Sequence, residues 1–142
     1  MKNFKQIGEG MYLGPQPSEF DLAEAKQQGI ATVIDLRMPA ETQVSNANLA
    51  EAHGLRYVNV PVDKSALSAT QIVALEQAIA ETDGPHLFHC ATGARAALML
   101  SLSRAEQQGW GAKRTLEEAA AMGFNLQSSD AFVEFVKTVR ER

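Results

Sequence analysis

Three short apolar runs, separated by segments with helical spacing, constrain the fold of this chain more than any other feature of its sequence. The runs read ATVIDL at 31–36, RYVNV at 56–60 and HLFHC at 86–90. Consecutive parallel strands need a crossover connection, which is usually a helix. The alternation therefore predicts one three-layer α/β domain over residues 1–142, in which helices cover both faces of a mainly parallel sheet of four to five strands.

Caps and glycines give the boundaries of the other elements. Ser18 and Ser68 are suited to cap helices that end near Gly29 and near residue 81. Further helices are predicted over 42–53, from near Arg95 to 108, over 113–122 and over 129–140. Glycines around the short runs 5–7 and 11–13 indicate an edge hairpin.

Composition excludes several classes of function. The chain has 13 Lys+Arg against 17 Asp+Glu, a net charge of −4, so it offers no overall field that attracts nucleic acid or anionic lipid. One cysteine and three histidines without metal-motif spacing predict no disulfide framework, no metal and no cofactor. No apolar run approaches the ~18 residues of a membrane span. We therefore expect a cytoplasmic protein without nucleic-acid or membrane partners, and its oligomeric state stays open.

The turn between the 86–90 strand and the next helix is the candidate site. Ligands in parallel α/β sheets bind beyond the carboxyl ends of the strands, and a turn that enters a helix leaves backbone amides pointing into one concavity. Gly93 permits close approach of the backbone to a ligand, and Arg95 can add a planar two-donor fork. With the partial positive charge of the helix N-terminus, these groups predict a cradle for a phosphate-sized oxyanion.

Cys90 lies at the floor of the predicted cradle. The field that binds an anion also stabilises a thiolate, and a thiolate beneath a tetrahedral oxyanion is placed for in-line attack. The alternatives are that Cys90 is a buried small apolar residue and that Arg95 is a surface helix residue. The spacing of Cys90, Gly93 and Arg95 over one turn favours the functional interpretation.

The H-C-x-x-G-x-R stretch from His89 to Arg95 resembles the signature loop of cysteine-dependent phosphatases of the protein-tyrosine and dual-specificity type. Those loops usually hold five residues between Cys and Arg, whereas this chain holds four, which is similar to the beta-lactamase hydrolase-like phosphatase family. Further matches along residues 11–124 are YLGPQPS, TVIDLR followed by Glu41, HGLRYVNVPV and GWGAKRTLEEAAAMGF. The resemblance implies a protein-tyrosine-phosphatase-like fold and a phosphorylated protein or small molecule as the substrate.

The resemblance also implies a role for each matching residue. Cys90 is expected to be the nucleophile that forms a phosphocysteine, and Asp63 the general acid that protonates the leaving oxygen and then activates water. His89 is expected to brace the loop, and Arg37 to line its rim. The phosphate oxygens are expected to be held by the arginine side chain and by the backbone amides of Ala91, Thr92, Gly93, Ala94 and Arg95.

Some residues depart from the family pattern or have another interpretation. Ala96 stands where relatives usually carry Ser or Thr, whose hydroxyl helps the thiolate to leave, and this favours slow turnover. Asp63 is equally compatible with a solvated turn residue, and Arg37 with an ion-pair partner of Glu41 or Asp35. A phosphomonoester phosphatase is therefore the leading hypothesis, beside a rhodanese-like sulfurtransferase and a non-catalytic oxyanion-binding module.

Overall fold

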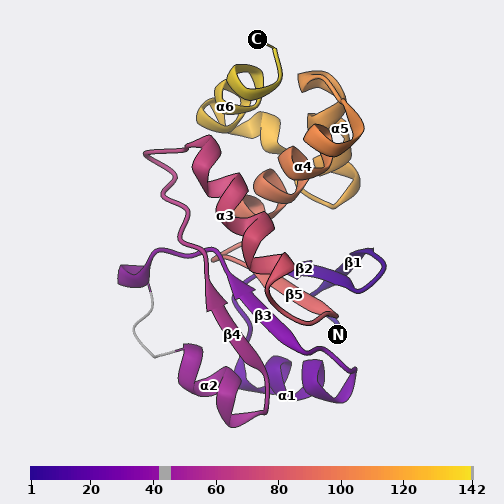
Figure 1. Ribbon diagram of the computed structural model, residues 1–142, viewed down its shortest axis with the longest axis vertical. Coiled ribbons are helices and arrows are strands. Elements are labelled where there is room, and N and C mark those ends of the chain that lie inside the picture. The colour runs from indigo at the N-terminus through magenta and orange to yellow at the C-terminus, as the bar shows by residue number, and fades with distance from the viewer. Residues whose placement is uncertain (42–45, 142) are drawn as a thin grey trace.

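The computed structural model describes residues 1–41 and 46–141, and its centre is a five-stranded sheet. The strands are β1 (Lys5–Gly8), β2 (Met11–Gly14), β3 (Thr32–Asp35), β4 (Arg56–Asn59) and β5 (His86–His89), in the spatial order β1-β2-β5-β3-β4. Only the β1–β2 pair is antiparallel among these strands. The prediction of a mainly parallel sheet with an edge hairpin is confirmed (Figure 1).

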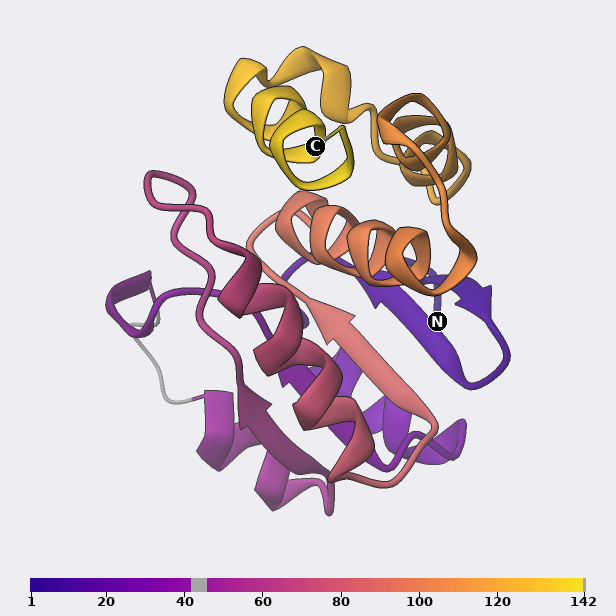
Figure 2. The same cartoon turned by 45° about the horizontal axis from the view of Figure 1, so that its top comes forward.

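Helices cover both faces of the sheet, as the alternation predicts. One face carries α1 (Glu19–Gln27) and α2 (Asn46–Ala52), and the other carries α3 (Ala69–Ala80) and α4 (Ala94–Gln108) (Figure 1). The last helices, α5 (Ala112–Ala121) and α6 (Asp130–Arg140), pack on the far side of α4 (Figure 2). Residues 42–45 of the helix predicted over 42–53 lie outside the described residues. Two short 3-10 segments, Pro39–Glu41 and Leu126–Ser128, are additions that helical spacing does not predict.

The position of α4 between the sheet and α5 and α6 explains its composition. Its residues 95–103 are all buried, including Arg95 and two serines. A helix that is apolar on every side needs neighbours on every side, and α5 and α6 supply the second set. By contrast, α5 and α6 are amphipathic, and each buries one face through residues such as Leu116 and Phe132.

The strand register gathers the carboxyl ends of four strands at one edge of the sheet. His89 pairs with Gly14 on one side and with Asp35 on the other, and Asp35 pairs in turn with Asn59. Because these four residues form one row, the loops that follow them leave the sheet side by side. The backbone of four loops therefore lies next to the candidate site, as expected for a parallel α/β sheet.

None of the described helices combines the length and the apolarity that a membrane crossing requires.

Candidate functional site

The loop from Cys90 to Arg95, hereafter the cradle, joins β5 to α4. Gly93 caps α4 at φ +106°, a left-handed conformation that glycine adopts without steric cost. Its backbone N–H donates to the Cys90 Sγ at 3.0 Å. The Gln16 amide, from the loop after β2, donates to the Ala91 carbonyl at 3.1 Å and holds the cradle from outside. The backbone at residue 93 therefore turns toward the cysteine sulfur.

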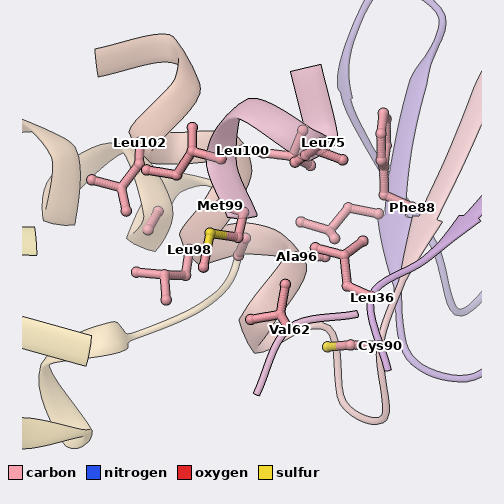
Figure 3. Close-up of a cluster of buried hydrophobic side chains, with 14 of the residues drawn as sticks. Leu36, Val62, Leu75, Phe88, Cys90, Ala96, Leu98, Met99, Leu100 and Leu102 are labelled. Atoms are coloured by element: carbon pink, nitrogen blue, oxygen red, sulfur yellow. The ribbon is translucent and has the colours of Figure 1, made fainter. Parts of the chain in front are cut away.

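Cys90 is buried, with 1% of its surface exposed. It belongs to the apolar cluster that includes Leu36, Val62 and Ala96, and Figure 3 shows it at the turn with these side chains beside it. Ala96 itself is fully buried, so the position after Arg95 presents a methyl group and no hydroxyl. The sulfur is thus enclosed on its core side by apolar groups.

Arg95 is buried at 3% exposure, and its guanidinium is held along one edge. Nη1 and Nη2 donate to the two carboxylate oxygens of Glu41, each at 2.7 Å, and Nη1 also donates to the Val62 carbonyl at 3.1 Å. A guanidinium has five N–H donors. These contacts do not use the Nε–H and one Nη2–H, which lie side by side on the other edge as a two-donor fork suited to an oxyanion. The Cys90 side chain also interacts with this guanidinium. The Glu41 hydrogen bonds, and also the nearby Cys90 side chain, raise the pKa of Arg95.

Glu41 is the residue that fixes this orientation, whereas the sequence indicated only that it could pair with Arg37. It ends the 3-10 segment after β3, and its carboxylate also accepts from the Met38 backbone amide at 2.7 Å. The hydrogen bonds from Arg95 lower the pKa of Glu41 to about 2, so the carboxylate is ionised at neutral pH. Its place after TVIDLR was visible in the sequence, but its contact is 54 residues away along the chain.

Arg37 lies beneath the cradle, which corrects the expectation that it lines the rim. It is 2% exposed and makes a bidentate pair with Asp35, with Nε and Nη2 at 3.0 Å and 2.8 Å from the two oxygens. Tyr57 adds a hydrogen bond to the same carboxylate at 2.7 Å. Burial opposes the ionised form, but the hydrogen bonds from Arg37 hold the pKa of Asp35 below its ordinary value. Of the two ion-pair partners considered for Arg37, Asp35 is the one engaged.

His89 connects this buried network to the cradle. Its Nδ1 lies 3.3 Å from the Cys90 carbonyl oxygen and 3.7 Å from Asp35 Oδ1, and the ring is fully buried. Burial lowers the pKa of His89 to about 4, against the attraction of Asp35. The ring is therefore neutral near pH 7 and can donate its Nδ1–H to the carbonyl. The geometry is that of a brace below the cradle.

Asp63 lies on the loop after β4, half-buried and directed at its own loop. Its Oδ1 accepts from the Ser65 hydroxyl at 2.6 Å and from the Ser65 amide at 2.9 Å. These hydrogen bonds lower the pKa of Asp63, and Arg95 adds a smaller effect in the same direction. The residue before it, Val62, contacts Arg95 through its carbonyl. Asp63 is thus near the cradle, with its carboxylate in the ionised, turn-forming state.

A pocket of about 410 Å³ opens over the cradle. Its floor is formed by Ala91, Thr92, Ala94 and Arg95, and Lys64 stands at one side. The opposite side is formed by residues between 124 and 132, hereafter the C-terminal wall, which belong to the segment from the end of α5 to the start of α6. Sequence reasoning missed this wall, because no residue type in it signals chemistry. Within the described parts of the chain, no cluster of three or more His, Cys, Asp or Glu side chains is arranged to bind a metal ion.

The tertiary structure thus brings Cys90, Gly93 and Arg95 together in one loop, and places His89 and Arg37 below it. The cradle resembles an anion site, because the Gly93 amide, the N-terminus of α4 and the Arg95 guanidinium lie beside the Cys90 sulfur.

Comparison with known proteins agrees with this geometry. Residues 3–107 match the family model described as the phosphatase-like domain of the beta-lactamase hydrolase-like protein. A beta-lactamase hydrolase-like protein of Xylella fastidiosa is 32% identical over 102 residues, which are 68% of this chain and 24% of that protein. The chain therefore spans about a quarter of the length of such relatives.

Solved structures share the fold over nearly the whole chain. A phosphatase candidate from Neisseria meningitidis has a TM-score of 0.80 and 26% identity, with 99% of each chain covered. TpbA from P. aeruginosa, solved in complex with pTyr, has a TM-score of 0.72 and 16% identity over 99% of this chain and 91% of that chain. With the family match over residues 3–107, the chain belongs to the beta-lactamase hydrolase-like phosphatase-like domain family and has the fold of protein-tyrosine phosphatases.

Proposed function

We propose that this chain is a cysteine-dependent phosphomonoester phosphatase that works through a phosphocysteine intermediate. The observation that carries the proposal is the cradle itself, in which the Cys90 sulfur, the Gly93 amide and the free edge of Arg95 converge at the N-terminus of α4. Membership of a phosphatase-like family supports the reaction type.

In the first step, the Cys90 thiolate attacks phosphorus in line with the leaving oxygen. The sulfur–phosphorus bond forms, the bond from phosphorus to the leaving oxygen breaks, and Asp63 gives its proton to that oxygen. The equatorial oxygens are held by the backbone amides of residues 91–95 and by the Nε/Nη2 edge of Arg95. Donors that are already fixed in place need no reorganisation during the reaction, which is why the Glu41 contacts at 2.7 Å matter.

In the second step, water replaces the cysteine. The Asp63 carboxylate takes a proton from water, the new phosphorus–oxygen bond forms, and the sulfur leaves as a thiolate with inorganic phosphate as the product. Relatives help this departure with a hydroxyl after the arginine. Because Ala96 offers only a methyl group, we expect the second step to be slow and phosphocysteine to accumulate.

Asp63 must be protonated and released from Ser65 before it can act as the acid. In its present state, the 2.6 Å hydrogen bond from the Ser65 hydroxyl favours the ionised form. We infer that substrate binding turns this carboxylate toward the leaving oxygen. The general acid therefore operates only in the lower part of the pH range.

A non-catalytic oxyanion-binding module is the second candidate, and two observations favour it. Ala96 lacks the hydroxyl that assists turnover, and Asp63 is occupied by Ser65. Such a module would bind phosphate through the same cradle but would not hydrolyse its esters.

Hydrolysis of p-nitrophenyl phosphate between about pH 5 and 7 tests the proposal, because the thiolate and a protonated acid must coexist there. Cys90→Ser is expected to abolish turnover, by roughly 10⁴-fold or more, and to retain binding of inorganic phosphate. Phosphorus-31 spectra of acid-quenched wild type should contain phosphocysteine. Phosphate binding without turnover in the wild type would instead support the binding module, and sulfur transfer from thiosulfate to cyanide would support the rhodanese-like alternative.

A further inference from the structure

The C-terminal wall lies outside the stretch that matches the family model. That match ends at residue 107, whereas the wall residues lie between 124 and 132. The cradle that handles phosphate belongs to the shared stretch, and the side of the pocket that the rest of a substrate would meet does not. The wall is therefore the side of the pocket that the family model does not describe, and selectivity for the rest of a substrate can be sought there.

The wall contributes both apolar and polar residues to the pocket lining, and Phe124 is its large apolar residue that is partly exposed. Its apolar members are Phe124, Leu126, Ala131 and Phe132. Its polar side chains bond to nearby backbone: Asn125 accepts from the Gln127 amide at 3.2 Å, Ser129 accepts from the Phe132 amide at 3.3 Å, and Ser128 donates to the Asn125 carbonyl at 3.0 Å. Hydroxyl and amide groups that already bond to the backbone have little remaining hydrogen-bonding capacity for a sugar or polyol.

The charges of the pocket suit one phosphoryl group. Among the described residues that line it, Lys64 and Arg95 are the cationic side chains, and Arg95 already faces Glu41. A substrate with several phosphates would need more cations than these two. A volume of about 410 Å³ is also near the lower end of the roughly 300–1,000 Å³ of small-molecule pockets.

Phe124 connects the wall to the cradle. A Cβ atom at residue 93 would lie 2.4 Å from Phe124 Cζ, so the aromatic ring rests directly against the Gly93 backbone. A group attached to a phosphate in the cradle would emerge beside this ring. Aromatic rings in contact gain about 0.5–1.5 kcal/mol beyond the area that they bury.

Building on the proposed phosphatase function, we propose that the C-terminal wall is a leaving-group site for an aromatic ring and that Phe124 is its specificity-determining residue. The substrate class is then a monophosphate ester of an aryl alcohol, such as a phosphorylated phenol or tyrosine side chain. An alkyl phosphate, including phosphoserine, would use the cradle and leave the wall unfilled.

The first experiment compares phenyl phosphate with propyl phosphate. The kcat/KM ratio of the two esters is measured in wild type and in Phe124→Leu, which keeps an apolar side chain over Gly93 but removes the ring. We expect the ratio to fall about three- to tenfold, and the inhibition constant of inorganic phosphate to stay within twofold. Phe20→Leu, at a phenylalanine with 74% exposure, is the matched control and should change neither quantity. An unchanged ratio, or an equal loss of phosphate binding, would overturn the proposal.

A second experiment separates this inference from the phosphatase function. Calorimetry measures the binding of phenylphosphonate and methylphosphonate to Cys90→Ser and to Cys90→Ser with Phe124→Leu. Tighter binding of phenylphosphonate, reduced three- to tenfold by the second substitution, supports the wall even in a protein that hydrolyses no ester. Equal binding of the two phosphonates, or no binding of either, overturns it even where the wild type is an active phosphatase.

Discussion

The cradle and the C-terminal wall border the same pocket, but different interactions hold them in place. Below and around the cradle lie two ion pairs: the Asp35–Arg37 pair is buried on both sides, and the Glu41–Arg95 pair has a buried arginine and a partly exposed carboxylate. The wall is held by apolar packing and by short-range caps such as Ser129 on α6. Charged groups out of water need fixed partners. The Arg95 side chain of the cradle is fixed by Glu41, 54 residues away along the chain, whereas hydrogen bonds over two or three residues fix the backbone of the wall.

This difference indicates that the cradle serves phosphoryl transfer and the wall serves recognition of the rest of the substrate. Chemistry on a phosphoryl group needs donors held in one geometry, and the long-range Glu41–Arg95 pair holds one of them. Recognition of the rest of the substrate needs a surface whose shape can vary among relatives without disturbing those donors. Substitutions in the cradle should therefore alter the binding of inorganic phosphate, and substitutions in the wall should leave it unchanged.

Lowering the pH should destabilise the protein through His89, which lies below the cradle, rather than through a residue of the C-terminal wall. The pKa of His89 is lowered to about 4 by burial, with Asp35 and Arg37 facing it. Between pH 6.5 and 4 the unfolded chain binds more protons at this residue, so the free energy of unfolding falls as pH falls, by on the order of 3 kcal/mol. Urea unfolding at several pH values checks this. His89→Asn should flatten the dependence, whereas His53→Gln, at a partly exposed ring, should not. An equal slope in His89→Asn would contradict the prediction.

Glu41→Gln should loosen Arg95 while preserving the size of the side chain. The substituted side chain keeps one carbonyl oxygen that can accept from the guanidinium, but its NH2 group sets a donor against the second guanidinium donor. One hydrogen bond and the charge pair are lost, and the Nε/Nη2 edge loses its alignment. We expect a 10- to 100-fold fall in kcat/KM and weaker inhibition by phosphate, measured by steady-state kinetics. Glu118→Gln, which removes the exposed pair with Arg114, is the control and should have little effect. Normal phosphate inhibition in Glu41→Gln would refute the assigned role.

Two helix caps provide a matched test of the wall. Ser129 caps α6 beside the pocket, and Ser68 caps α3 away from it. Loss of either hydroxyl through substitution by alanine should lower the free energy of unfolding by about 1 kcal/mol. Only Ser129→Ala should also reduce the preference for phenyl over propyl phosphate, by a few-fold, with phosphate inhibition unchanged. The same preference in both variants would mean that the wall does not contribute to selectivity.

Ser65→Ala should produce the smallest effect, a shift in pH dependence. The Ser65 hydroxyl and the Ser65 amide both lower the pKa of Asp63, the hydroxyl more strongly. The substitution removes only the hydroxyl, so the pKa of Asp63 rises and the acid stays protonated to higher pH. The basic limb of the kcat/KM profile should therefore move upward, by less than about one pH unit, and Asp63→Asn should remove it. A basic limb that stays in place would show that Asp63 is not the group that titrates there.

Much of the fold could be predicted from the sequence because its signals are local. The runs at 31–36 and 86–90 and the caps Ser18 and Ser68 each act within a few residues, and the helices and strands appear where these signals place them. The candidate loop was equally visible, because Cys90, Gly93 and Arg95 lie within one turn. Short-range spacing of this kind survives folding unchanged, so it can be interpreted before the structure is known.

Side-chain contacts that depend on packing could not be predicted in this way. Arg37 had two candidate partners, and only packing decides that Asp35 holds it below the cradle and that Glu41 holds Arg95. The wall was missed for the same reason, since Phe124 meets Gly93 only when α5 and α6 fold over α4. By itself, the sequence determined the strand–helix alternation and the anion-binding turn, because both depend on neighbouring residues. The tertiary structure alone decided which edge of Arg95 stays free and what lines the pocket, because burial and charge pairing depend on the whole chain.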